Sequence, residues 1–133
     1  FSVDENEIDF AESVTYRGMM FTGLPNMTWV MGYFRASWTL RVDLIGDFVC
    51  RLLQHMDSKK ARQVNITLGE EDKDMELLPW GDTQEFNPGY LQRSRHKMAK
   101  RGTKDNWQHT QDYWVEREEM PDINLDEEIF SYQ

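Results

Sequence analysis

The stretch that decides the fold of this chain is Pro25-Asn26-Met27-Thr28-Trp29-Val30-Met31-Gly32-Tyr33-Phe34-Arg35-Ala36-Ser37-Trp38-Thr39-Leu40. It predicts a turn, then a buried strand over residues 27–33, then a short connection and the start of a long apolar helix. The strand is nearly all apolar without alternation, which is typical of a central strand covered on both faces. Because a helix N-terminus carries free N–H groups and a positive dipole end, we expect these groups to face a negative or electron-rich ligand edge.

The expected helix covers residues 38–56, with Ser37 or Thr39 as its N-cap. Its apolar residues recur every three or four positions, and they are Leu40, Leu44, Ile45, Phe48, Val49, Leu52, Leu53 and Met56. Since this stripe is broad, we expect other parts of the protein to cover most of the helix. Gly46 inside the helix costs about 1 kcal/mol relative to alanine, which favours close packing at that position. Cys50 lies in the same apolar pattern and is expected to be a small core residue.

Shorter elements are expected on both sides of this unit. Residues 1–13 carry five acids and no Lys or Arg, which predicts a solvated loop, either alone or with one edge strand. Residues 15–21 form either a strand or a loop that enters the core. Residues 62–68 predict another strand, because Val64, Ile66 and Leu68 alternate with polar residues.

The rest of the chain predicts two helices and an acidic arm. The first helix covers residues 88–101, with Pro88 in its first turn and Gly102 ending it. The second covers residues 107–120. The arm, residues 122–133, is expected to lie over another surface through its apolar residues, which are Ile123, Leu125, Ile129 and Phe130. The predicted fold class is therefore α/β, with a strand, turn and long helix in residues 1–60 and a mainly helical tail in residues 61–133.

Composition excludes several kinds of protein. The 133 residues carry a formal net charge of −9, which argues against a nucleic-acid partner. No apolar run is long enough for a transmembrane segment, and residues 1–20 do not have the pattern of a signal peptide. The single cysteine excludes an internal disulfide and favours a reducing compartment, so we expect a cytoplasmic location.

Several motifs that carry chemistry are absent from the sequence. It contains no Gly-x-Gly-x-x-Gly run, Walker loop, paired-cysteine site or His-Glu-x-x-His run. We therefore expect no dinucleotide pyrophosphate loop and no metal site in this chain. His55, His96 and His109 are far apart in sequence and are expected on polar helix surfaces.

Two groups of residues leave alternatives open. Six Lys or Arg and no acid lie between residues 86 and 104, which indicates either an anion site or a solvated face paired with the acidic ends of the chain. We favour the solvated face. The second group is aromatic and either lines a cavity or pins the tail to the core, which we favour. Its members are Trp80, Phe86, Tyr90, Trp107, Tyr113 and Trp114.

Two longer blocks of sequence carry a family resemblance. The first is Gly18-Met19-Met20-Phe21-x-Gly23-x-Pro25-Asn26 … Gly32-Tyr33-x-x-Ala36-Ser37-Trp38-Thr39-Leu40 … Asp43-Leu44 … Val49-Cys50-Arg51-Leu52-Leu53-x-x-Met56. The second is Phe86-x-Pro88-Gly89-Tyr90-x-x-Arg93-Ser94 … Lys100-x-Gly102 … Trp107-x-x-x-Gln111-Asp112-Tyr113. Both resemble the C-terminal part of class B flavoprotein monooxygenases of the Baeyer–Villiger type, in the group of the ethionamide-activating enzyme. The similarity covers about residues 13 to 125.

This resemblance implies a parent enzyme with one dinucleotide-binding domain for FAD and one for NADPH. Such enzymes use NADPH and oxygen to insert an oxygen atom next to a ketone carbonyl or to oxidise a heteroatom. In that family the last strand and helix of the Rossmann-like FAD domain lie beside the pyrimidine edge of the flavin ring. The resemblance therefore assigns residues 1–60 to the end of that domain and residues 61–133 to a C-terminal tail. It assigns no catalytic residue to this chain, and its implied FAD-binding residues are Ala36, Ser37, Trp38, Thr39 and Leu40.

The chain also departs from the family pattern. Arg35 stands where the family has a small polar residue, and the glycine-rich fingerprints, signature motif and active-site arginine lie upstream of the residues present here. We therefore expect the isolated chain to be inactive, to bind FAD weakly or not at all, and to need the missing N-terminal part of the enzyme as its partner. The alternative is a non-catalytic structural module, derived from such an enzyme, that self-associates through its apolar helix and unpaired strand.

Overall fold

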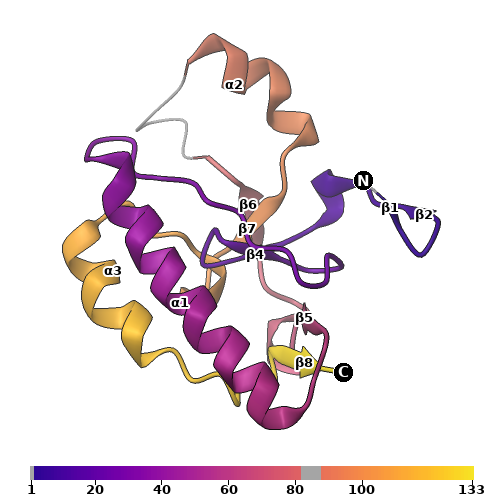
Figure 1. Cartoon of the computed structure of the whole chain (residues 1–133). Coiled ribbons are helices and arrows are strands. Elements are labelled where there is room, and N and C mark those ends of the chain that lie inside the picture. Colours follow the sequence, from indigo (N-terminus) through magenta and orange to yellow (C-terminus); the bar gives the residue numbers. More distant parts are fainter. Residues whose placement is uncertain (1, 82–87) are drawn as a thin grey trace.

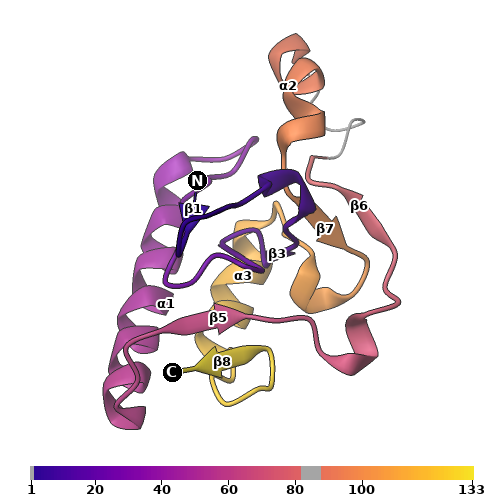
Figure 2. The same ribbon diagram turned by 90° about the vertical axis from the view of Figure 1, so that its right-hand side faces the viewer.

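The computed structural model describes residues 2–81 and 88–133 and combines helices with small sheets. The longest element is helix α1 (Trp38–Lys59), and helix α3 (Tyr113–Glu119) lies beside it (Figure 1). The third helix, α2 (Gly89–Ser94), stands apart from this pair in both ribbon views (Figure 2). No helix among the described residues is long and apolar enough to span a membrane. The expected mixed α/β class is confirmed.

Every sheet in the described part of the chain is a two-stranded antiparallel pair. β1 (Ser2–Val3) pairs with β2 (Asn6–Glu7), and β3 (Thr15–Tyr16) pairs with β4 (Met20–Phe21). β5 (Val64–Ile66) pairs with the C-terminal strand β8 (Phe130–Tyr132), and β6 (Leu77–Pro79) pairs with β7 (Lys100–Gly102). The strand predicted over residues 62–68 is therefore confirmed at its centre. Residues 15–21 form a hairpin, and residues 2–7, expected as a loop, form a second one.

One main core joins the two halves of the sequence. α1 contributes Ile45, Phe48, Leu52 and Met56, which recur at helical spacing on one face. Each such side chain stabilises the fold by about 1.5–3 kcal/mol when it is fully buried. The other buried members of this core are Val14, Tyr16, Met19, Met20, Val64, Ile66, Trp107, Met120, Ile123, Leu125, Ile129 and Phe130. The four apolar residues of the acidic arm are thus buried, as expected, against the chain itself. The division at residue 60 stays a prediction.

Helix α1 begins at Trp38 as predicted and ends three residues later than expected. Ser37 occupies the N-cap position. At the other end Lys60 adopts a left-handed conformation with φ of 56°, and its N–H bonds to the carbonyl groups of Asp57 and Met56. This arrangement satisfies carbonyl groups that a helix end otherwise leaves unpaired.

A second apolar face of α1 is largely uncovered by the described residues. We call it the outer face, and it consists of Trp38, Val42, Gly46, Cys50 and Leu53. Leu53 is 55% exposed, Cys50 is exposed, and a Cβ built on Gly46 meets no atom within 4 Å. The predictions of a largely covered helix, of close packing at Gly46 and of a buried Cys50 are therefore wrong for this structure, because the chain supplies packing partners for one helix face.

The central strand predicted over residues 27–33 is also wrong for this structure. The segment belongs to no β-ladder, and Val30 is 44% exposed. The N–H of Trp29 donates to the carbonyl of Met19 at 2.7 Å, which does not extend into a ladder. The described chain offers no neighbouring strand on which a ladder can form, so the apolar pattern alone does not make a strand here.

The tail is less helical than predicted. α2 ends at Ser94, a 3₁₀ turn occupies Arg95–Lys97, and the remaining residues of the predicted first helix lead into β7. The second helix begins at Tyr113 rather than at residue 107 and continues into a 3₁₀ turn at Met120–Asp122. Pairing of β7 with β6 overrides the helix propensity of residues 98–102, so the expectation of a mainly helical tail is wrong.

The aromatic residues of the tail divide into two groups. Trp80 and Trp107 are buried and pin the tail to the body of the protein, as favoured from the sequence. Tyr90 and Trp114 are exposed, so they do not pin the tail to the core. Tyr113 is half-buried beside Tyr33, and Phe86 lies outside the described residues.

Candidate functional site at the start of helix α1

The five residues predicted to bind a cofactor form the exposed start of α1. Ala36, Ser37, Trp38 and Thr39 are exposed, and Leu40 is half-buried. Ser37 occupies the N-cap position, but its side chain caps no backbone N–H, and its Oγ lies 3.0 Å from Thr39 Oγ1 instead. A 22-residue helix therefore presents its positive dipole end at the surface without a side-chain cap.

The apolar segment 27–33, called the extended segment below, packs against the start of α1 at Gly32. A Cβ built on Gly32 would lie 2.4 Å from Cδ2 and 2.8 Å from Cα of Trp38. Such distances do not occur for real Cβ atoms, so this close approach requires glycine. Trp38 lies over Gly32 on one side and is 48% exposed on the other.

A buried ion pair lies next to the turn of residues 34–37, which connects the apolar segment 27–33 to α1. Arg41 Nε donates to Glu116 Oε2 at 2.8 Å and its Nη2 donates to Oε1 at 3.0 Å, while the two side chains are only 1% and 4% exposed. The Tyr33 hydroxyl donates to Glu116 Oε2 at 2.5 Å. Burial, followed by the hydrogen bond to Glu116, raises the pKa of Tyr33 above its usual range. Tyr33 is therefore neutral and acts as a hydrogen-bond donor.

The remaining donors of Arg41 bind backbone carbonyl groups. Its Nη1 donates to the carbonyl of Met31 at 2.8 Å, and its Nη2 also donates to that of Arg17 at 2.7 Å. A buried arginine needs hydrogen-bond acceptors for its guanidinium, since leaving a buried charge unpaired costs free energy. The guanidinium thus joins α1, the extended segment, the β3–β4 turn and α3.

The segment before α3 also contacts the turn. The N–H of Phe34 donates to Gln111 Oε1 at 2.9 Å. Two residues earlier, His109 lies against Trp80, and its Nε2 is 2.8 Å from the Trp80 carbonyl. Burial, with smaller contributions from the charges of Arg41 and Arg101, lowers the pKa of His109 to about 4. The expectation of His109 on a polar helix surface is therefore wrong, because the residue lies in an extended segment packed on the core.

Sequence reasoning missed Arg41, Gln111 and Glu116 at this site. A signal for Arg41 was present, because its position is four residues before Ile45 and so falls on the buried face of α1. A charged residue on a buried helix face requires a partner. Nothing in the local sequence identifies Glu116 as that partner, 75 residues away.

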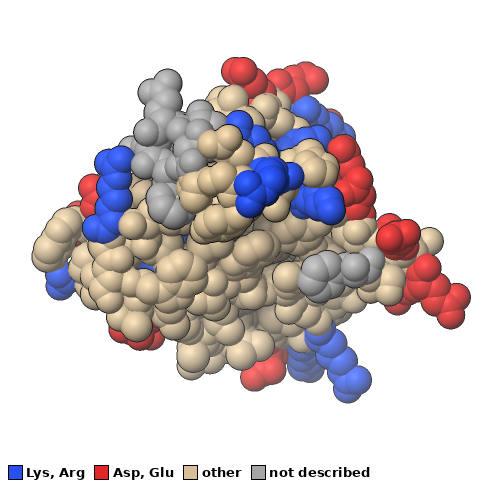
Figure 3. All heavy atoms as spheres, turned by 90° about the horizontal axis from the view of Figure 1, so that it is seen from above, with Lys and Arg blue, Asp and Glu red and all other residues tan. Residues whose placement is uncertain are grey.

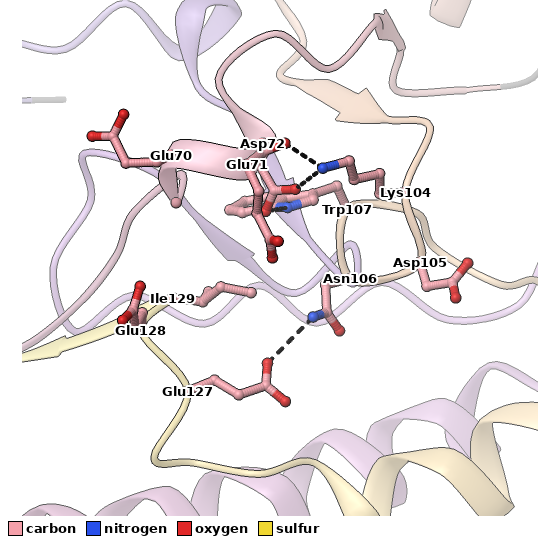
Figure 4. A pocket seen from close by; sticks show the side chains of 11 residues that line it. Glu70, Glu71, Asp72, Lys104, Asp105, Asn106, Trp107, Glu127, Glu128 and Ile129 are labelled. Carbon is pink, nitrogen blue, oxygen red and sulfur yellow. Dashed lines mark hydrogen bonds and ion pairs between the residues drawn. The ribbon is translucent and has the colours of Figure 1, made fainter.

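A separate cleft of about 720 Å³ lies away from this turn. Figure 4 shows Asp72 between Lys104 and Trp107, and the distances are 2.7 Å to Lys104 Nζ and 2.8 Å to Trp107 Nε1. Burial opposes ionisation of Asp72, but these two hydrogen bonds hold its pKa below the usual value. Its buried carboxylate is already satisfied by protein groups, so this contact has a structural role.

Two lysines of the basic stretch of residues 93–104 are paired with acidic residues, Lys100 with Glu12 and Lys104 with Asp72. Figure 3 shows several Lys and Arg side chains near one another on the face seen from above, with Asp and Glu side chains beside them. Lys100 lies 3.3 Å from Glu12 of the acidic N-terminal segment. This arrangement supports the solvated, paired face that the sequence favoured over an anion site.

Comparison with known proteins adds relatives of named activity. The chain is 38% identical over 112 residues to the FAD-containing monooxygenase EthA of Mycobacterium tuberculosis, which covers 84% of the chain and 22% of EthA. It is 32% identical over 131 residues to the probable FAD-binding monooxygenase AlmA of Acinetobacter baylyi, covering 98% of the chain and 26% of AlmA. With the putative FAD-containing monooxygenase MymA of M. tuberculosis it shares 34% identity over 105 residues, 79% of the chain and 20% of MymA.

The chain therefore spans about a quarter of the length of these curated relatives or less. No family model matches it, and no solved structure matches it. The resemblance of the two sequence blocks to the C-terminal part of flavin-containing monooxygenases is confirmed by these relatives, and the Baeyer–Villiger type stays a prediction.

Proposed function

We propose that this homologue of the FAD-containing monooxygenases forms one wall of a flavin site within a larger enzyme. The observation that carries the proposal is the exposed start of α1 at Ala36–Leu40, where the positive end of a long helix has no side-chain cap. Reduced flavin carries negative charge at the pyrimidine edge of its ring. Backbone N–H groups at a helix N-terminus stabilise such charge.

The residues present fit the ring edge of FAD and not its phosphates. Residues 36–39 are exposed and no side chain caps the start of α1, so we infer that its first N–H groups face a planar ring edge. The sequence has no glycine-rich phosphate loop, so other parts of the enzyme would bind the pyrophosphate. FAD, when bound, supplies the redox chemistry. This chain's contribution is to orient the ring and favour its anionic form.

The wider activity follows from the family resemblance. We infer that the whole enzyme uses NADPH as reductant and inserts oxygen beside a ketone carbonyl or oxidises a heteroatom. The isolated chain is expected to lack catalytic activity. Its single cysteine, which excludes an internal disulfide, is compatible with the cytoplasmic location that we propose.

The outer face of α1 supports a place within a larger protein. Gly46 lowers helix propensity and packs on nothing here, although glycine in a helix usually serves close packing. Leu53 and Trp38 are large apolar side chains on the same face, and both are about half exposed. We infer that the rest of the enzyme covers this face, with Gly46 allowing a close backbone approach. The short share of each relative that the chain matches agrees with this inference.

A second candidate function uses the same face differently. A non-catalytic module would bury the outer face of α1 against a second copy of itself. Leu53→Glu distinguishes the two readings in analytical ultracentrifugation. A dimer that Leu53→Glu dissociates favours the module, and a monomer in both forms favours the enzyme part.

A chimera tests the proposed function. In this chimera the present chain replaces the homologous segment of EthA. The purified chimera is examined for bound flavin and for NADPH oxidation. We expect a yellow protein that oxidises NADPH, since the helix start would meet the flavin edge as in the parent. A soluble, folded but colourless and inert chimera would contradict the proposal.

A further inference from the structure

A distant part of the chain holds the turn that we propose faces the flavin. Residues 34–37 belong to no ladder and no helix, and the Ser37 side chain caps no backbone N–H. Residues 35–37 are exposed, and in an exposed segment outside helices and ladders the contacts made by neighbouring elements have a large effect on conformation. The conformation of the turn therefore depends on the elements packed around it.

Glu116 contacts both ends of this turn. Tyr33 stands immediately before the turn and donates to Glu116 Oε2 at 2.5 Å. Arg41, in the first turns of α1, binds both oxygens of the same carboxylate at 2.8 and 3.0 Å. Arg41 also donates to the carbonyl of Met31 at 2.8 Å, which joins the two sides of the turn directly. One buried carboxylate thus ties the segment before the turn to the helix after it.

Gln111 contacts the turn itself. Its Oε1 accepts the N–H of Phe34 at 2.9 Å. Gln111 immediately precedes Asp112, whose carboxylate caps α3 by accepting the N–H of Trp114 at 2.9 Å. This cap defines where α3 begins, so Gln111 and Glu116 are carried by one capped unit. Both contacts to the turn therefore come from the start of α3.

We propose that Gln111 and Glu116 are positioning residues, which hold residues 34–37 and the start of α1 in the orientation that the flavin edge requires. The inference rests on the proposed function, since it takes that turn as flavin-facing. Neither residue needs to touch the flavin. Gln111 acts through the backbone of Phe34, and Glu116 acts through Tyr33 and Arg41.

NMR of the full chain tests this role through Gln111, because Glu116 variants can unfold the protein. We expect Gln111→Ala to raise amide hydrogen exchange at Phe34 about five- to tenfold, the effect of losing one hydrogen bond. The same variant should weaken the response of amides 36–40 to added riboflavin severalfold. Amides in β5 should exchange at wild-type rates, which a general loss of stability would not allow.

Two further variants serve as controls. Gln111→Glu keeps an acceptor for the Phe34 N–H and should restore both readouts. Gln54→Ala changes an exposed glutamine on α1 and should leave both unchanged.

The positioning role and the flavin site fail on different results. Wild-type exchange at Phe34 and a wild-type riboflavin response in Gln111→Ala would overturn the positioning role and leave the flavin site standing. No response of amides 36–40 to riboflavin in the wild-type chain would overturn the flavin site. In that case exchange at Phe34 still reports whether Gln111 holds the turn.

Discussion

Arg41 and Glu116 form a bidentate ion pair between α1 and α3, with both side chains almost completely buried. The pair lies directly behind the turn that begins α1, and Tyr33 shares the same carboxylate. Two residues 75 positions apart therefore join the early and late parts of the chain at the candidate site. The consequences can be tested by substitution.

The first prediction concerns the stability that depends on this pair. Glu116→Ala should lower the free energy of unfolding by about 3–5 kcal/mol, because it leaves the Arg41 charge buried without its partner. Urea denaturation followed by tryptophan fluorescence measures this change. The double variant Arg41→Met with Glu116→Leu should lose much less than the single variant, since it leaves no unpaired charge.

Glu119 on the same helix provides a matched control. It pairs with Arg17 at 3.1 Å, but the two side chains are 49% and 20% exposed. Glu119→Ala should therefore change stability by no more than about 1 kcal/mol. Equal losses for Glu116→Ala and Glu119→Ala would contradict the role assigned to the buried pair.

The second prediction concerns the contact between Gly32 and Trp38. Gly32→Ala should destabilise the chain by about 1–3 kcal/mol, because the new methyl group would overlap the ring and backbone of Trp38. NMR shifts of amides 36–40 should change as the helix start moves. Unchanged shifts together with unchanged stability would show that Trp38 does not pack on Gly32 in solution.

The third prediction concerns Gly46 on the outer face of α1. Gly46→Ala should stabilise the isolated chain by about 0.5–1 kcal/mol, because alanine has the higher helix propensity and its Cβ meets nothing within 4 Å. In the EthA chimera the same substitution should reduce the yield of folded, flavin-containing protein, since the rest of the enzyme would pack there. Stabilisation in both settings would argue against that interface.

The fourth prediction concerns pH. The pKa of His109 is about 4 in the folded chain and near 6.5 when unfolded, so the unfolded state binds more protons between these values. Its neutral form therefore contributes stability that is fully present above about pH 6.5 and is lost as pH falls toward 4. The loss amounts to about 3 kcal/mol.

Two glutamine variants isolate this contribution. His109→Gln keeps a donor for the Trp80 carbonyl and should flatten the dependence of unfolding free energy on pH between 4 and 6.5. His96 is exposed, and His96→Gln should leave that dependence as in the wild type. Acidic groups such as Asp72 titrate alike in all three proteins and cancel in the comparison. A wild-type slope in His109→Gln would contradict a buried, neutral His109.

The sequence predicted best where local periodicity and burial agree. Ile45, Phe48, Leu52 and Met56 form the buried face of α1, and Val64 and Ile66 form a strand, as their spacing indicates. The apolar residues Ile123 and Phe130 of the acidic arm are buried as expected. In each case the pattern repeats over enough residues to specify which face is covered.

Other elements depend on partners that the local sequence does not name. The apolar segment 27–33 lacks a neighbouring strand, and the outer face of α1 lacks a covering element. Residues 100–102 pair with β6 instead of continuing a helix. The five predicted site residues do lie together, but the contacts from Gln111 and Glu116 that hold them come from 71 or more positions beyond Leu40, and no spacing rule reaches that far.

The most direct test of the proposal that the start of α1 faces the flavin is an NMR titration of the wild-type chain with FAD, followed at the amides of Ala36–Leu40. ADP serves as the control, because it carries the two phosphates of FAD but not the flavin ring. This control is needed because a helix N-terminus also binds phosphate. Because the chain lacks a phosphate loop, we propose that it retains weak binding of the ring, and the predicted result is shifts at these amides that grow with FAD concentration and are absent with ADP. Unmoved amides at the highest soluble FAD concentration, or equal shifts with ADP, would contradict the account.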